Sequence, residues 1–414
     1  MIARIAVVAS LALVACGGSS NTADNDLDVA PLVTVEEILR IGSVDDPDYG
    51  FTGINGVDVD RDGRIWVFEA TDMQFRVYAP DGTLVRRVGG RGEGPGEFRD
   101  SPRFGIVGDT VWAIETFGRR LSLFRRDGTH LSTVPIQVVS VPLQRNVGLV
   151  MPVQMRDDGL FTSDLTVFTS SRDVQLAAES DTVPVPRVLY NSAGIAIDTV
   201  GWVPQLPPAP RTTREQVMIG GNRYYIPQPP ADAPLSITVP DGRIVVDRPT
   251  ASSAEPAAIT ITRLDLAGDT VWRRSYSYHP RPFTEAALDT TAWRTARTPG
   301  GGIPIINGVP VRPPTPADSM EVFHHLRGAM SFPSYQSPVR GHRLGNDGSL
   351  WLTREDEAGS TQRWSIIDAR GSALGTVDLP RSQYPIRIDG DTFFVIDRDE
   401  FDVPWLVQYR LRIE

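Results

Sequence analysis

Polar side chains stand at corresponding places in a recurring unit of this sequence, each at the end of a short apolar run. They are Glu69, Glu115, Asp164, Arg248, Arg354 and Asp397. Gathered in a ring, such groups can hold a polar ligand or a divalent cation, because such cations prefer oxygen ligands. Alternatively, each carboxylate caps the loop after its strand or pairs with an arginine such as Arg76 or Arg120. The residue types leave both interpretations open.

Other residue types that carry chemistry give weaker signals. The five histidines have no metal-ligand spacing with a partner, and there is no Gly-x-Ser-x-Gly nucleophile motif. Aromatic residues near the expected loops, including Tyr335, can stack on a sugar or a peptide, or can simply pack the loops. We therefore predict no resident cofactor and no metal site, and a divalent cation only if the ring of carboxylates binds one.

The unit that positions the ring residues is a polar turn followed by an alternating apolar strand. Its copies start at Asp62-Gly63, Gly108-Asp109, Asp158-Gly159, Asp241-Gly242, Asp347-Gly348 and Gly390-Asp391. Further strand–turn–strand patterns follow these copies, so each unit supplies four strands, a to d. Asp-Gly between alternating apolar runs favours a hairpin, because the turn needs positive φ. Six such units predict an all-β, six-bladed β-propeller with four-stranded antiparallel blades over residues 33–414.

The last unit ends without a fourth strand. Residues 34–42 resemble the d strand at 84–89 in their alternation of apolar and charged side chains. We therefore expect this N-terminal segment to close the ring by pairing with the C-terminal strand at 405–411.

Long insertions fall only where strand b leads to strand c or strand d leads to the next strand a. These connections share one face of a propeller, here called the insertion face; the short a–b and c–d turns share the opposite turn face. The main insertions cover residues 203–234 and 281–337, and 281–337, between blades four and five, is expected to be partly helical at 284–289 and 317–326. We expect this insertion face to bind the ligand of an envelope binding module, with 281–337 as a lid. The alternative is that the insertions shield a hydrophobic opening.

The N-terminus predicts export and lipidation. Residues 1–15 combine Arg4 with an apolar run too short to span a membrane, which is typical of a signal peptide. The stretch Leu13-Val14-Ala15-Cys16 resembles a bacterial lipobox, with Cys16 as the lipidated residue. Residues 17–26 are small and polar, as in a flexible tether, and we expect the lipidated tether to cover residues 16–32. Gly17 is not the aspartate of inner-membrane retention, so we expect an envelope protein held by its lipid in the outer membrane.

Composition narrows the partners. The chain of 414 residues has a net charge of −10, which excludes nucleic acid as a ligand because phosphate binding needs clustered basic residues. Cys16 is the single cysteine, so the folded part contains no disulfide. We expect a monomer whose partners are the membrane and an unknown peptide, glycan or small molecule.

The stretch from Gly56 to Phe98 resembles NHL-repeat proteins and related bacterial six-bladed propellers. The resemblance is carried by residues 56–67, by Phe75-Arg76-Val77-Tyr78 and by Gly94-Pro95-Gly96-Glu97-Phe98. It is close in blades one and two and loose in blades three and four. It implies the fold and a binding role. The alternative is a metal-dependent hydrolase or lyase of the propeller lactonase type, with the ring carboxylates, including Glu115, around the metal.

Overall fold

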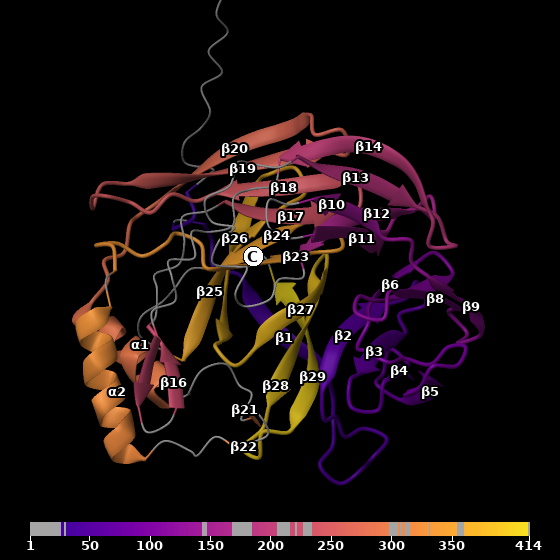
Figure 1. The fold of residues 1–414 in the computed structure, drawn as a ribbon, viewed down its shortest axis with the longest axis horizontal. Coiled ribbons are helices and arrows are strands. Elements are labelled where there is room, and N and C mark those ends of the chain that lie inside the picture. Colours follow the sequence, from indigo (N-terminus) through magenta and orange to yellow (C-terminus); the bar gives the residue numbers. More distant parts are fainter. Residues whose placement is uncertain are drawn as a thin grey trace, which may run out of the picture.

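The computed structural model describes residues 26–28, 30–142, 147–167, 184–204, 216–219, 222–226, 234–297, 305–306, 309–310, 315–330, 332–353 and 360–412. Among them lie six sheets that form the six blades of a propeller (Figure 1). The expected all-β fold is therefore confirmed. Cys16 and the expected signal peptide lie outside the described residues. No helix in the described ranges is long and apolar enough to cross a membrane.

Each blade is an antiparallel sheet whose strands follow one another along the chain, except that blade six takes its outer strand from the N-terminus. Blade one consists of β2 (Ile54–Val59), β3 (Ile65–Glu69), β4 (Gln74–Tyr78) and β5 (Leu84–Gly89). Blade two consists of β6 (Arg103–Val107), β7 (Thr110–Glu115), β8 (Arg120–Arg125) and β9 (His130–Pro135). Blade three has five strands, β10 (Val139–Pro142), β11 (Val147–Met155), β12 (Phe161–Val167), β13 (Pro184–Tyr190) and β14 (Ala196–Pro204). The extra strand β10 pairs with the inner edge of β11.

The second half of the ring repeats this plan. Blade four consists of β17 (Leu235–Val239), β18 (Gly242–Asp247), β19 (Ala257–Asp265) and β20 (Thr270–Tyr278). Blade five consists of β23 (Gly341–Leu344), β24 (Leu350–Thr353), β25 (Thr361–Ile367) and β26 (Ala373–Pro380). Blade six consists of β27 (Tyr384–Asp389), β28 (Thr392–Arg398), β29 (Pro404–Arg412) and β1 (Thr34–Ile41).

The Asp-Gly turns work as the sequence indicates. Gly63 and Gly348 have φ angles of 77° and 81°, which an L side chain rarely adopts. Asp60 supports the first of these turns, since its side chain accepts hydrogen bonds from the backbone N–H groups of Asp62 and Arg64. Each such turn thereby sets the register between strands a and b of its blade.

The ring is closed by the N-terminal strand. β1 pairs antiparallel with β29 from Thr34 opposite Arg412 to Ile41 opposite Leu406, as the resemblance between segments 34–42 and 84–89 predicts. Joining the first and last segments of the chain removes the open edge that β29 would otherwise present.

A short N-terminal arm, residues 26–28 and 30–33, precedes β1 and lies against the outer strands of blades four and five. Leu27 donates its backbone N–H to Ser277 and is buried in the core that these two blades share. Val33 donates to Thr376 and is buried between blades five and six. Part of the segment we expected to be tether is thus docked on the propeller.

Apolar clusters fill the interfaces between most blades. Blades one and two share an aromatic cluster in which the rings of Phe68, Phe75 and Phe98 pack edge to face. Further clusters join blades two and three, four and five, five and six, and six and one. In the described ranges, no such cluster joins blade three to blade four.

The two long insertions pack against each other. Residues 203–234 supply the hairpin of β15 (Gln216–Ile219) and β16 (Asn222–Tyr225), and residues 281–337 supply α1 (Glu285–Arg297), α2 (Pro316–Ala329) and the short strands β21 (Ile305–Ile306) and β22 (Val309–Pro310). Figure 1 shows α1, α2 and β16 side by side at one edge of the molecule. Their small core is separate from the blades and contains Ile219, Tyr224, Ile226, Ala292, Ala296, Val322 and Leu326. The two insertions therefore form one capping unit, and helices at both expected places are confirmed.

Candidate functional site

A cavity of about 1190 Å³ lies at the centre of the propeller. The ends of the inner strands and the a–b turns form much of its wall, so it opens on the turn face. All six blades contribute, through Asp58, Phe104, Arg156, Asp241, Asp347 and Arg387 among others. Between blades four and five the cavity extends outward to Trp272 and Arg370.

The cavity wall is charged but balanced. Among the described residues it contains six arginines, Arg103, Arg156, Arg263, Arg274, Arg370 and Arg387, and six aspartates, Asp58, Asp157, Asp158, Asp241, Asp265 and Asp347. Three ion pairs lie within this set, Arg156 with Asp158, Arg263 with Asp241 and Arg387 with Asp58. Aromatic and aliphatic groups, including Phe104, Trp112 and Trp272, fill the wall between the charges. Such a wall suits a ligand with polar groups and apolar faces but no large net charge.

Asp58 is the most buried charged group of this wall. Its carboxylate accepts backbone N–H groups of Val59 at 2.7 Å and Ile106 at 2.7 Å, and Arg387 Nη1 lies 2.9 Å from Asp58 Oδ1. Burial raises the pKa of Asp58, while the charge of Arg387 and the two N–H groups oppose that rise. The aspartate therefore ties blades one, two and six together beside the cavity.

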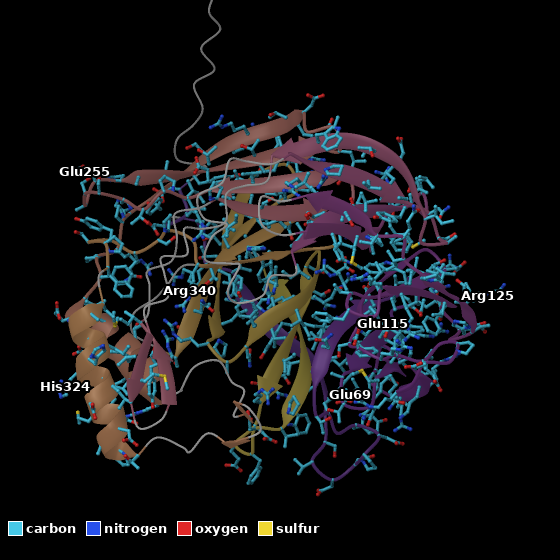
Figure 2. All side chains as sticks on the ribbon, viewed as in Figure 1. Glu69, Glu115, Arg125, Glu255, His324 and Arg340 are labelled. Carbon is cyan, nitrogen blue, oxygen red and sulfur yellow. The ribbon has the colours of Figure 1, made fainter. Side chains whose placement is uncertain are left out.

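Glu69 and Glu115 are the best-defined members of the ring predicted from the sequence, and Figure 2 places them within blades one and two. Glu69 is 0 % exposed and accepts hydrogen bonds from Thr52, Gly53 and Asp72. Glu115 is 1 % exposed and accepts the backbone N–H groups of Arg99 and Asp100. These contacts match the alternative interpretation, in which the carboxylates organise the loops of the insertion face.

Arg120 completes the environment of Glu115. Its guanidinium lies 2.7 Å from Glu115 Oε2 and also donates to the backbone carbonyl of Glu97. Both oxygens of Glu115 therefore accept hydrogen bonds. Oε1 accepts from the backbone N–H groups of Arg99 and Asp100 and from Arg120, and Oε2 accepts from Arg120. A cation at Glu115 would have to displace these donors.

The other predicted residues lie apart from one another. Asp164 accepts from Thr238 and Arg243 between blades three and four, and Asp397 accepts from Arg40 of β1. Arg248 is buried and donates to Ser337 and Val339. Tyr335 is half-buried and pairs with Pro282 where the helical insertion leaves the propeller. Arg354 lies outside the described residues, and no described member of the predicted set lines the cavity.

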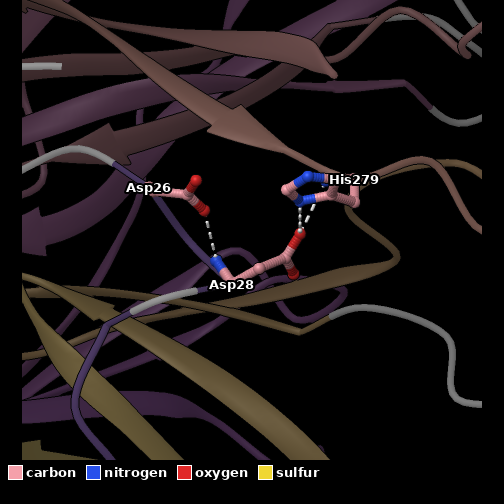
Figure 3. Close-up of side chains that lie close together, drawn as sticks. All are labelled: Asp26, Asp28 and His279. Carbon is pink, nitrogen blue, oxygen red and sulfur yellow. Dashed lines mark hydrogen bonds and ion pairs between the residues drawn. The ribbon is translucent and has the colours of Figure 1, made fainter. Parts of the chain in front are cut away.

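The N-terminal arm has its own cluster of polar side chains (Figure 3). Asp28 accepts the backbone N–H of His279 at 2.6 Å, and its carboxylate lies 3.3 Å from the imidazole Nδ1. Asp26 lies on the other side of Asp28 and accepts its backbone N–H at 2.8 Å. The ligand atoms of the three side chains lie within 4.8 Å of one another. His279 is exposed and the two aspartates are half-buried, and their contacts fasten the arm to the end of β20.

No protein-family model matches the chain, and a search of curated proteins finds no relative. Solved structures of similar shape include a protein of Bacteroides fragilis described as exported, with 12% identity over 94% of this chain and 98% of that chain at a TM-score of 0.44. A member of the DUF4221 family from Bacteroides vulgatus has 8% identity over 93% and 100% of the chains at a TM-score of 0.46. Virginiamycin B lyase from Staphylococcus aureus has 12% identity over 92% and 100% at a TM-score of 0.34. These scores are too low to carry an argument, and the pairing of the strands itself makes this chain a six-bladed β-propeller.

Proposed function

We propose that this propeller is a non-enzymatic binding module of the cell envelope, which takes its ligand into the central cavity through the turn face. The observation that carries the proposal is a cavity of about 1190 Å³ whose wall is drawn from all six blades. Because the wall belongs to rigid strands and tight turns, the site is largely formed before the ligand arrives, which lowers the entropic cost of binding.

The wall supports a glycan or a peptide as the ligand class. Its formal charges cancel, which favours neutral or zwitterionic molecules. Phe104 and Trp272 offer surfaces for the apolar faces of sugar rings or side chains, and the exposed Arg103 and Arg370 offer donors at the wall. The volume exceeds what a drug-sized molecule fills, since such pockets measure roughly 300–1,000 Å³.

The envelope location in this proposal rests on residues 1–16. The signal-peptide pattern and the lipobox-like end at Cys16 support a lipid anchor, and Gly17 supports the outer membrane. The resemblance to NHL-repeat propellers in residues 56–98 also supports a binding role. The metal-enzyme alternative has less support, because protein donors already satisfy Glu69 and Glu115.

The proposal is tested by calorimetric binding of neutral oligosaccharides and zwitterionic peptides to a soluble chain that begins after Cys16. In the double variant Arg103→Ala/Arg370→Ala we expect affinity for a bound member of the panel to fall roughly tenfold or more, since each lost hydrogen bond contributes about 1 kcal/mol. Both side chains are exposed, so the fold should be unaffected.

Arg125→Ala is the matched control. Arg125 is an exposed arginine of β8 that does not line the cavity, and Figure 2 shows it at the outer edge of blade two. The Arg125→Ala variant should bind the ligand with the same affinity as the parent chain. Equal affinity of the control and the double variant would place the ligand elsewhere and overturn the proposal.

A further inference from the structure

The interface between blades three and four differs in chemistry from the other blade interfaces. Where the others contain apolar clusters, the described residues here bring together Asp164 of β12, Arg187 of β13, Thr238 of β17 and Arg243 of β18. Charged groups of this kind are rarely buried between sheets unless each is paired.

Arg187 is the centre of this polar interface and is only 4 % exposed. Its Nη1 donates to the backbone carbonyl of Gly242 at 2.8 Å. Its Nε and Nη2 are buried and, within the described part of the chain, have no hydrogen-bond partner. A guanidinium has five N–H donors in a fixed fork, so donors on two adjacent nitrogens are left for an acceptor that the described residues do not supply.

Nearby charges make the interface positive. Arg243 pairs with Asp164 at 3.2 Å, but its buried Nε has no hydrogen-bond partner among the residues that the structure describes. Arg263 pairs with Asp241. Among the described residues, three guanidiniums, those of Arg187, Arg243 and Arg263, therefore face two carboxylates. Burial and then the charge of Arg243 lower the pKa of Arg187 to about 10, so it remains cationic at neutral pH.

We infer that the interface of blades three and four is a binding site for a small oxyanion, which accepts hydrogen bonds from Arg187 and Arg243 and neutralises the surplus positive charge. Planar guanidinium forks match the oxygen spacing of phosphate, sulfate and carboxylate groups, and charge-assisted hydrogen bonds of this kind are strong where water is excluded. The site is distinct from the proposed ligand cavity and does not require that proposal to hold.

The cavity provides the route to this site. Thr238, Asp241 and Arg263 line the cavity and also belong to, or contact, the polar interface. An anion that enters from the turn face would therefore pass Arg263 before it reaches Arg187. Its binding would join blades three and four where the described residues contain no apolar cluster.

The test uses the soluble chain that begins after Cys16, freed of oxyanions by dialysis into a chloride buffer. Inorganic phosphate, sulfate and acetate are titrated separately at constant ionic strength, with thermal unfolding and calorimetry as readouts. We expect a saturable rise in Tm, because a ligand that binds the folded state alone stabilises it by mass action. A response to phosphate and sulfate only assigns a tetrahedral oxyanion, and a response to acetate extends the site to carboxylates.

Arg187→Met removes the fork and keeps a long side chain, and we expect it to weaken anion affinity roughly thirtyfold or more. Arg243→Gln, at the partly exposed edge of the interface, should also weaken anion affinity. It replaces Arg187→Met in the test if that variant does not fold. Arg125→Met is the surface control and should respond like the parent. The inference is wrong if the parent chain shows no saturable response, or if a folded Arg187→Met or Arg243→Gln variant responds as strongly as the parent.

Discussion

A chain that begins at Gly42, without β1, should lose cooperative unfolding. Seven residue pairs of the β1–β29 ladder disappear with this truncation, together with the buried side chain of Ile41. At roughly 0.5–1.5 kcal/mol for each backbone hydrogen bond, the loss is comparable to the total stability of about 5–15 kcal/mol of a typical domain. Urea unfolding followed by circular dichroism and by tryptophan fluorescence should then give broad transitions that do not coincide.

Two longer chains serve as controls for this truncation. A chain that begins at Asp26 keeps the arm and β1 and should unfold like the parent. A chain that begins at Thr34 keeps β1 but loses the buried Leu27 and Val33, so it should remain cooperative with a lower midpoint. If the chain that begins at Gly42 melts like the one that begins at Asp26, closure by β1 does not stabilise the ring.

Arg387→Met should lower the free energy of unfolding by about 3–5 kcal/mol at neutral pH, because it leaves Asp58 as a buried charge without its cation. The effect should depend on pH with a definite sign. Burial already raises the pKa of Asp58, and loss of Arg387 raises it further above the value in the unfolded chain. The folded variant therefore binds a proton more readily than the unfolded one, so lowering the pH from 7 toward 5 should shrink the difference from the parent.

The measurement is urea unfolding at both pH values. The double variant Asp58→Asn/Arg387→Met removes the buried charge and should recover most of the stability at pH 7. Arg410→Met is the control, since Arg410 and Asp391 form an exposed pair at 3.7 Å and such pairs contribute about 0–1 kcal/mol. A loss in Arg387→Met that does not change with pH, or that is no larger than in Arg410→Met, would contradict this account.

Local sequence signals were sufficient to predict the blades. Asp-Gly turns and alternating strands act over a few residues, so the residues of each hairpin are enough to predict it. The similarity of 34–42 to 84–89 predicts the closure of the ring. The strand β10 was not predicted, because the short run at Val139–Pro142 has no turn signal of its own. The helical pattern at 317–326 predicts α2 but not which side of it is covered: α2 buries Val322 and Leu326 and leaves Met320 exposed, since it packs against the β15–β16 hairpin.

The cavity was harder to anticipate than the fold. Its wall consists of groups such as Asp58 and Arg387, which lie far apart in the chain and meet only when the ring closes. The sequence pointed instead to the ends of the b strands, where Glu69 and Glu115 recur at equivalent places. In blades one and two that recurrence reflects a shared loop-capping role. A structural role that recurs leaves the same regular pattern in the sequence as a shared ligand site.

The docked N-terminal arm also fixes an orientation. Asp26 pairs with Ser277 near the end of β20, where the chain passes to the insertion face, whereas the cavity opens on the turn face. With the lipid that we propose on Cys16, a leash of nine residues would join it to Asp26, and nine residues span about 30 Å at most. Such a leash would hold the insertion face and its capping unit toward the bilayer and turn the cavity mouth outward. A ligand would then arrive from the aqueous compartment, not from the lipid surface.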